Sequence, residues 1–302
     1  MRKRPTITVG IPTYLGGSHL IQVLKSIYQE ENISLIENVI VVSDGRKISP
    51  SVVKKIKHKK LRIIQAQERE GQSSRINDII QATKTDLLIL TNDDVLFLPT
   101  ALSSVVSEYK HTKSEMISVA TYPIKPKTLI ERVLKASADI KRDVIGQIAK
   151  KETYLTTNGR FIVLSKKVYK HLSLPEKLVN SDAYIYFHVL AKKIRHSYIE
   201  DVVCLYREPG TLREHVNQVY KFQMSFNENG KYFTKRFLRN KYKVNKAVLI
   251  KANIRALVRN PLYVSLYFLT FAVVRVCIAL KVYDMSGINE GFWETDYTTK
   301  SI

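Results

Sequence analysis

Cysteine is scarce in this sequence, with only Cys204 and Cys277 among 302 residues. Their wide separation excludes a disulfide framework and a cysteine-rich metal site, and it is typical of a protein from a reducing compartment. A signal-peptide core is also missing, because the basic residues 1–5 (MRKRP) lead directly into a strand-like segment. We therefore expect the chain to be translated into the cytoplasm.

Acidic residues are outnumbered: 27 Asp and Glu stand against 49 Lys and Arg, which gives a formal net charge of +22. Residues 229–260 contain ten basic residues and no acid, and the most apolar run of the chain follows directly. A basic block beside an apolar segment predicts attachment to an anionic cytoplasmic leaflet. Because no zinc-finger spacing and no aromatic RNA-binding signature occurs, we expect an anionic membrane surface as the acidic partner rather than nucleic acid.

The apolar run, residues 261–280, is about long enough to cross a bilayer. Arg275 within it raises the cost of insertion by roughly 2.5 to 3.5 kcal/mol. Basic residues before the run and acids after it fit a cytoplasmic N-terminal side. We predict association with the cytoplasmic face of the cell membrane, either as a single span or as a peripheral helix in the interface; burial against the rest of the protein is the alternative.

Both common nucleotide-binding glycine loops are missing. The first predicted strand is followed by PTYLGGS (residues 12–18) instead of G-x-G-x-x-G, and no G-x-x-x-x-G-K-[ST] loop is found. If the protein binds a nucleotide, its phosphates are therefore held by other means, and a metal ion is the first candidate.

The N-terminal part alternates strand and helix patterns. Buried strands are predicted at residues 6–11, 39–42, 61–64 and 87–90, and helices at 19–29 after the N-cap Ser18, from Ser49-Pro50 onward, and at 73–82. Polar residues stand at the strand ends. The order predicts an α/β protein with a doubly wound, mostly parallel sheet flanked by helices, which binds a nucleotide, followed by a helical C-terminal region.

Residues 87–99, LLILTNDDVLFLP, contain the most informative strand end. The apolar run stops at Asn92, Asp93 and Asp94, at the edge of the sheet where such folds bind ligands. Adjacent carboxylates repel each other unless a cation lies between them, and a divalent ion that also holds phosphates would supply it. The alternative is an Asx turn at Asn92-Asp93 with Asp94 in solvent.

Four motifs in order resemble the inverting family 2 glycosyltransferases of GT-A fold: PTY (12–14), VVSDG (41–45), a glycine-to-asparagine helix start (71–77) and LTNDDV-x-x-x-P (90–99). TNGRF (157–161), LP (174–175) and NSD (180–182) are similar to the acceptor half of that family. The resemblance covers roughly residues 5–225. It implies a GT-A domain at 1–228, with a nucleotide-sugar half at about 1–122 and an acceptor half at about 123–228, before a membrane-associating region at 229–302.

The resemblance implies a set of donor contacts. Asp44 would bind the nucleotide base, although it is also a suitable turn cap, and Pro12 and Tyr14 would wall the base and ribose, although Tyr14 is equally suited to a core. The nucleotide-facing side chains would further include Gly71, Arg75, Asn77, Asn92 and Asp93. An arginine on a solvated helix face is the alternative for Arg75.

The metal motif of this family is usually D-x-D, and Asn92-Asp93-Asp94 aligns with it as N-x-D. The resemblance therefore implies Asp94 as the first choice for the ligand of Mn²⁺ or Mg²⁺ and Asp93 as the second. Because an amide replaces the first carboxylate, weaker metal binding is expected.

Asp182 matches the catalytic base of the family, with Ser181 in place of the usual glutamate. The alternative is that Asp182 caps a helix at 183–191. Gly159, Gln218 and Lys221 would lie on the acceptor or phosphate side. The segment 218–222, QVYKF, resembles the Q-x-x-R-W of processive members, but its substitutions favour transfer of a single sugar.

These features predict a metal-dependent inverting glycosyltransferase that moves a sugar from a nucleotide diphosphate sugar to a lipid-linked or polysaccharide acceptor. A sugar-phosphate nucleotidyltransferase shares the sheet topology, but its G-x-G-[ST]-R-type loop is missing after the first strand. A non-catalytic membrane or nucleic-acid adaptor on a transferase fold is the other alternative, because Asn92 and Ser181 depart from the family pattern.

Overall fold

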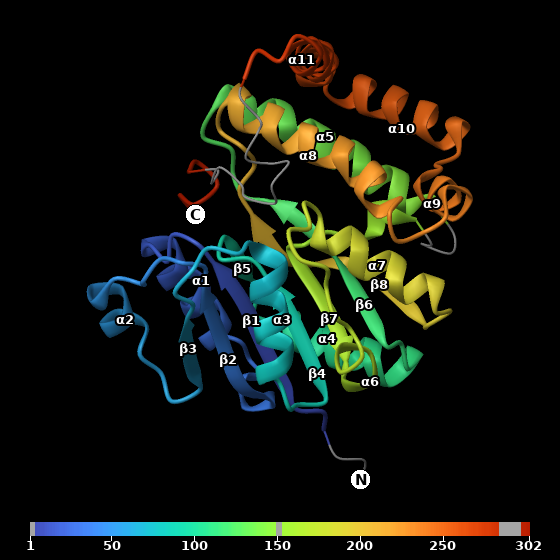
Figure 1. The fold of residues 1–302 in the computed structure, drawn as a ribbon. Helices are drawn as coiled ribbons and strands as arrows, with labels where there is room; N and C mark the ends of the chain where they lie inside the picture. The colour runs from blue at the N-terminus through green and yellow to red at the C-terminus, as the bar shows by residue number, and fades with distance from the viewer. Residues whose placement is uncertain (1–3, 149–152, 284–296) are drawn as a thin grey trace.

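A computed structural model describes residues 4–148, 153–283 and 297–302 of the chain. An eight-stranded sheet lies at its centre, in the order β3-β2-β1-β4-β7-β6-β8-β5 (Figure 1). The strands are β1 (Ile7–Thr13), β2 (Ile36–Ser43), β3 (Leu61–Gln65), β4 (Leu87–Thr91), β5 (Val95–Phe97), β6 (Met116–Pro123), β7 (Phe161–Ser165) and β8 (His196–Tyr206).

Strand direction divides this sheet. The pairs β3-β2, β2-β1, β1-β4 and β6-β8 are parallel, whereas β4-β7, β7-β6 and β8-β5 are antiparallel. The predicted α/β class and mostly parallel sheet are confirmed for the N-terminal strands, and the complete sheet is mixed. The four predicted strands match β1, β2, β3 and β4 within three residues at either end. β1, β4 and most of β2 are buried, whereas β3 lies at the edge of the sheet and is only partly buried.

Helices cover both faces of the sheet. They are α1 (Ser18–Tyr28), α2 (Pro50–Ile56), α3 (Gln72–Ala82), α4 (Ala101–Thr112), α6 (Lys166–Tyr169), α7 (Ser181–Ala191) and α9 (Lys235–Tyr242). Side chains of α1, α2 and α4 form one buried cluster with alternate residues of β1 and β2. The other cluster contains side chains of α3, α6, α7 and α9. The predicted N-cap Ser18 is wrong: Ser18 is the first helical residue, after Gly17.

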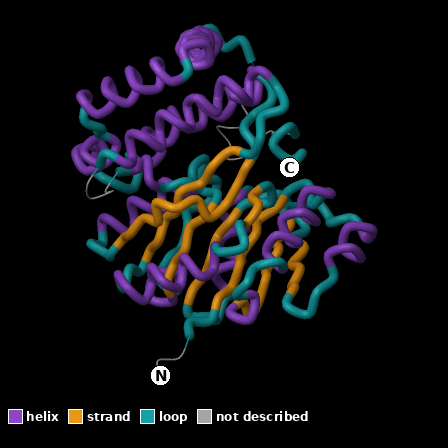
Figure 2. The backbone as a smooth tube through the Cα atoms, turned by 180° about the vertical axis from the view of Figure 1, so that it is seen from behind, coloured by secondary structure: helices purple, strands orange, loops and turns teal. Residues whose placement is uncertain are grey.

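Four helices lie beyond the carboxyl ends of β1 and β4, above the sheet in Figure 1: α5 (Leu129–Gly146), α8 (Leu212–Asn229), α10 (Lys246–Arg259) and α11 (Pro261–Ala279). Both views place α10 and α11 on the outer side of α5 (Figure 2). A small apolar cluster joins α5 to these two helices through Ile140, Val144, Ala252 and Val264. Leu238 of α9 is fully buried within the second sheet cluster.

The outer surface of α10 and α11 is apolar. We call it the apolar helical surface, and it consists of exposed Ile250, Ile254, Leu257, Val258, Leu262, Phe268, Leu269, Phe271, Val273 and Val276. Within the described residues, α11 is the single helix whose length and composition would suffice to cross a membrane. It packs lengthwise on the protein, because Val264 near its start and Val274 near its end are both buried.

Candidate active site

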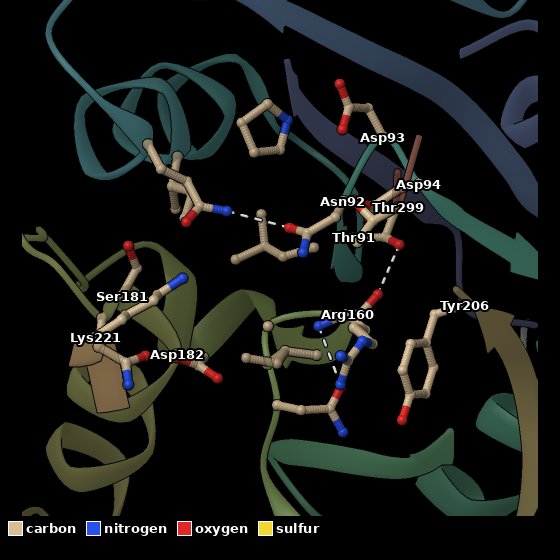
Figure 3. Close-up of a pocket in the computed structure, with 18 of the residues that line it drawn as sticks. Thr91, Asn92, Asp93, Asp94, Arg160, Ser181, Asp182, Tyr206, Lys221 and Thr299 are labelled. Atoms are coloured by element: carbon tan, nitrogen blue, oxygen red, sulfur yellow. Dashed lines mark hydrogen bonds between the residues drawn. The ribbon is translucent and has the colours of Figure 1, made fainter. Parts of the chain in front are cut away.

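A cavity of about 330 Å³ lies at the carboxyl ends of β1 and β4, and residues of α5 and α8 also line it. Residues far apart in sequence meet around it. In Figure 3, Asp182 and Lys221 approach from one side, Arg160 and Tyr206 from another, and Asp94 and Thr299 from above. Most predicted site residues line it: Pro12, Tyr14, Asp44, Gly71, Arg75, Asn92, Asp93, Asp94, Gly159, Asp182, Gln218 and Lys221.

Asp93 is held by the fold on both carboxylate oxygens. Its Oδ2 accepts hydrogen bonds from Thr13 Oγ1 at 2.5 Å and from His19 Nε2 at 3.1 Å, and its Oδ1 accepts one from Lys300 Nζ at 2.5 Å. Burial alone would raise the pKa of Asp93, but the Lys300 ammonium and His19 together bring it well below its usual range. The carboxylate is therefore ionised and fixed at the edge of the cavity.

Asp94 shares the same cation. Its Oδ2 accepts hydrogen bonds from Lys300 Nζ at 2.8 Å and from Thr299 Oγ1 at 3.1 Å. The ammonium of Lys300 thus relieves the repulsion between the two adjacent carboxylates, and this pairing raises the pKa of Lys300 against the opposing effect of burial. In this structure the cation beside the two carboxylates is the Lys300 ammonium, and the divalent ion stays a prediction.

Segment 297–302 is anchored independently of Lys300. Thr298 Oγ1 accepts a hydrogen bond from the backbone N–H of Gly210 at 2.7 Å, and the Thr298 backbone N–H donates to Glu214 Oε1 at 3.0 Å. The Thr298 hydroxyl also contacts the other oxygen of Glu214. Gly210 and Glu214 lie around the start of α8, so this region positions Thr299 and Lys300 over Asp94.

The residues around Asp94 fit a divalent ion only with help from other ligands. No group of three or more His, Cys, Asp or Glu side chains that could hold a metal occurs among the described residues. The Asn92 amide oxygen accepts from Gln72 Nε2 at 3.1 Å, whereas Asp94 Oδ1 has no hydrogen-bond partner within the described ranges. One carboxylate together with donor phosphates and water is a common way to hold Mg²⁺, so Asp94 is the residue that fits this role.

Asp44 joins the end of β2 to the start of α3. Its Oδ1 accepts the backbone N–H of Glu70 at 2.8 Å, and its Oδ2 accepts that of Gly71 at 3.0 Å. Gly71 has φ 90°, a conformation that favours glycine. Asp44 is therefore a structural clamp of this loop as well as part of the cavity wall, which agrees with the turn-cap alternative.

Arg75 serves the same clamp. Its guanidinium lies 3.3 Å from Asp44 Oδ1 and 2.9 Å from Asp78 Oδ2, and it also pairs with Glu70. With 5% exposure it is not on a solvated helix face. Its cation is compensated by three carboxylates, so it supports Asp44 more directly than it faces a phosphate.

Asn77 is a correction to the predicted nucleotide contacts. Its amide exchanges two 2.9 Å hydrogen bonds with the backbone of Leu174, and it does not line the cavity. The helix period explains this, because α3 turns Asn77 away from the face that carries Gln72 and Ile76. Tyr14, by contrast, is not a core residue: it lines the cavity, with the Arg69 guanidinium 4.0 Å from its ring centroid.

Asp182 lies in the first turn of α7, two residues after the N-cap Asn180. Its Oδ1 accepts the backbone N–H of Ala183 at 3.0 Å. A Cβ on Gly159 would lie 3.6 to 3.7 Å from the Asp182 side chain. The loop that leads into β7 therefore packs directly against this carboxylate. Burial raises the pKa of Asp182 above its ordinary value, and the Lys221 ammonium opposes this effect. Asp182 is therefore a cavity carboxylate rather than the N-cap of α7.

Five cavity cations were not among the predicted site residues: Arg69, Lys141, Arg160, Arg207 and Lys300. Arg160 stands within the TNGRF motif, which could have indicated it. Lys141 and Lys300 lie outside any recognised motif. They reach the cavity only through the packing of α5 and of segment 297–302.

A comparison with known families decides the class of protein. The sequence model of Glycosyl transferase family 2 matches residues 8–173, more than half of the chain. The chain belongs to glycosyl transferase family 2. It is a glycosyltransferase that moves a sugar from a nucleotide sugar, which rules against the nucleotidyltransferase alternative.

Solved structures resemble this family 2 glycosyltransferase over most of its length. The mannosyltransferase PcManGT from Pyrobaculum calidifontis, in complex with GDP-Man and Mn2+, has a TM-score of 0.60 at 17% identity, covering 96% of this chain and 86% of that one. S. aureus TarS, in complex with UDP-GlcNAc, has a TM-score of 0.51 at 14% identity, covering 87% and 83%.

A third structure has the same fold. The glucosyl-3-phosphoglycerate synthase from Mycobacterium tuberculosis, in complex with Mn2+, UDP and phosphoglyceric acid, has a TM-score of 0.54 at 12% identity, covering 80% of each chain. At these identities the likeness shows the GT-A fold alone. No curated protein sequence matches this glycosyltransferase.

Proposed function

We propose that this glycosyltransferase transfers one sugar, with inversion, from a nucleotide diphosphate sugar to a lipid-linked or polysaccharide acceptor at a membrane surface. The observation that carries the proposal is that Asp94 and Asp182 line one cavity from its two halves. A donor diphosphate held near Asp94 and an acceptor hydroxyl near Asp182 would meet between them.

Asp182 is proposed as the general base. Its partly buried carboxylate has a raised pKa, which increases its affinity for the acceptor proton. The Lys221 ammonium acts in the opposite direction and favours the ionised carboxylate that a general base requires. The acceptor oxygen would attack the anomeric carbon from the Asp182 side as its proton passes to Asp182. Because the nucleoside diphosphate leaves from the opposite face of the sugar, the configuration at that carbon would be inverted.

The donor half supplies the remaining roles. Pro12, Tyr14, Asp44 and Gly71 would surround the nucleoside, since they form the wall where β1, β2 and α3 meet. Asp94 is proposed to hold Mn²⁺ or Mg²⁺, which would neutralise the charge of the leaving diphosphate. PcManGT and the glucosyl-3-phosphoglycerate synthase were each solved with Mn2+, which supports this choice of ion.

Membrane attachment is proposed through the apolar helical surface. Because α11 packs lengthwise on α5 and α8 through Val264 and Val274, we place it in the plane of the interface rather than across the bilayer. The basic residues of 229–260 would contact anionic headgroups, except Arg255, whose guanidinium is paired with Asp143 at 2.8 Å. The protein would then lie at the cytoplasmic face of the membrane.

Hydrolysis of a panel of nucleotide sugars with Mn²⁺ or Mg²⁺ tests the proposal directly. We expect slow release of nucleoside diphosphate from one donor or a few related donors, and loss of that release in Asp94→Asn. Equal rates with Asp94→Asn, or no nucleotide binding under any condition, would contradict the proposed donor chemistry.

A further inference from the structure

Lys141 is an unpaired cation in the cavity wall. It lies on α5 and lines the cavity, and within the described residues its ammonium has no hydrogen-bond or ion-pair partner. Lys135, two turns earlier on the same helix, bonds both Tyr122 and Asp139. Lys141 is only partly buried, so its ammonium is available to a negatively charged ligand in the cavity.

Arg160 is a second such cation. Its guanidinium lies over the Tyr206 ring, 3.5 Å from the centroid, and makes no hydrogen bond or ion pair with any described residue. Stacking uses the face of the guanidinium and leaves the N–H groups of its edge available. Those groups match the oxygens of a phosphate or carboxylate.

The two cations act on each other. Burial, and next the positive charge of Arg160, lower the pKa of Lys141 from 10.5 to about 8. The carboxylates of Asp182 and Glu208 act in the opposite direction without pairing with Lys141, and Glu208 already accepts the Tyr206 hydroxyl at 2.7 Å. The cavity therefore holds two neighbouring positive charges, and an anion bound between them would relieve their mutual repulsion.

The position of Lys141 assigns this anion to one half of the cavity. Glu208 acts on both cations; Arg160 is also influenced by Asp94 on the donor side, whereas Lys141 is influenced by Asp182. An anion between the two cations would lie beside the proposed base, on the acceptor side of the diphosphate.

The opposite face of α5 leads to the membrane side. Ile140 and Val144, which flank Lys141 along this helix, pack against Ala252 of α10 and Val264 of α11. A single helix thus separates the cavity cations from the helices that carry the apolar helical surface. A phosphate attached to a hydrocarbon chain would fit this arrangement. Its phosphate would match the cations, and its chain would match the apolar helical surface.

We propose that Lys141 and Arg160 bind a phosphate group of the acceptor and hold it beside Asp182. The proposal rests on the proposed glycosyl transfer and narrows its acceptor class to phosphate-bearing molecules. It concerns binding alone, so it can be measured without knowing the sugar.

The test begins with calorimetry on the full chain. Nucleoside diphosphates are titrated with Mg²⁺, which by itself tests the donor site. Inorganic phosphate is then titrated into the protein saturated with the nucleoside diphosphate that binds best. We expect phosphate to bind under these conditions, and to bind at least about tenfold more weakly to Lys141→Met and to Arg160→Met, each of which loses a charge-assisted hydrogen bond.

Controls separate binding from folding. Lys135→Met removes a cation of the same helix outside the cavity and should leave phosphate affinity unchanged, while Lys141→Arg should retain most of it. Melting temperatures identify any variant that fails to fold. Wild-type affinity in Lys141→Met would overturn the proposal, and so would competition of phosphate with the nucleoside diphosphate, because the cations would then belong to the donor site.

A second ligand distinguishes the source of the phosphate. Dodecyl phosphate that binds more tightly than inorganic phosphate, with the advantage reduced in Leu269→Asp, would assign the subsite to a lipid phosphate. Equal affinity for both would assign it to a water-soluble phosphate ester. If phosphate binds and no nucleoside diphosphate does, the subsite stands and the proposed donor function fails.

Discussion

The Lys300 ammonium lies 2.8 Å from Asp94 Oδ2, although 206 residues separate the two in sequence. This pair places a monovalent cation at the carboxylate that best fits a divalent ion. A metal ion and Lys300 would therefore compete for Asp94, and the anchoring of segment 297–302 by Gly210 and Glu214 sets how readily the ammonium leaves.

Replacing Lys300 should increase metal affinity. In Lys300→Met the divalent ion no longer competes with an ammonium, and the two carboxylates are left without their counter-ion. We expect Mn²⁺ to bind about tenfold more tightly in calorimetry, in line with the worth of one charged hydrogen bond. Lys235→Met, an exposed change on α9, is the matched control. Unchanged affinity in Lys300→Met would show that the ion binds elsewhere.

Asp94→Asn and Asp93→Asn should separate binding from stability. Asp94→Asn is expected to abolish metal-dependent nucleotide binding while leaving the melting temperature close to wild type. Asp93→Asn removes a buried charge bonded by Thr13, His19 and Lys300, so it should lower the free energy of unfolding by roughly 3 kcal/mol or more. Calorimetry and urea denaturation of both variants give the comparison, and the reverse pattern would exchange their roles.

Asp182→Asn should impair transfer alone. The amide keeps the size of the side chain and an oxygen that can accept the Ala183 N–H, but it cannot take a proton. We expect donor affinity and melting temperature to survive while transfer falls by roughly 10²- to 10⁴-fold, the usual worth of general base catalysis. Transfer at the wild-type rate would remove Asp182 from the mechanism.

Burial of His196 predicts a loss of stability in mild acid. Burial, and next the Lys241 charge, lower the pKa of His196 from its usual 6.5 to about 4, and its ring bonds Ser118 Oγ at 3.0 Å. Because the unfolded chain takes up this proton first, the stabilising contribution is complete above pH 6.5 and is lost as the pH falls through about 4. The loss is about 3 kcal/mol.

The contribution of His196 can be isolated by difference. Unfolding free energies from urea denaturation at neutral and acidic pH are compared for the wild type and His196→Gln, since carboxylate effects are common to both. The variant should show a smaller decrease in acid. An identical decrease in the two proteins would mean that His196 titrates normally in the folded state.

Anionic membranes should bind the apolar helical surface. We expect the full chain to sediment with vesicles that contain phosphatidylserine, and to bind them less as salt rises above about 0.1 M, where exposed charges are screened beyond about 10 Å. The double variant Ile254→Asp and Leu269→Asp, at exposed positions, should stay in solution without unfolding. Melting temperatures of the wild type and of the double variant are compared to check that both proteins are folded.

The sequence alone determined the elements whose signals are local. Apolar runs specified β1, β2 and β4, because a strand buried on both faces needs no information from distant residues. The position of Asp93 and Asp94 at the end of β4 followed from the abrupt end of such a run. Likewise, the order of short motifs was sufficient to indicate the family and the cavity residues Tyr14 and Asp182.

The tertiary structure decided which partner each of these side chains has. Asn77 bonds the Leu174 backbone instead of facing the nucleotide, and Arg75 pairs with Asp44. Both contacts depend on the rotation at which helix α3 packs on the sheet. Lys300 reaches Asp93 and Asp94 across more than 200 residues. Local sequence carries no signal for such a contact, since ion pairing depends on atoms within a few ångströms and chain folding alone brings those atoms together.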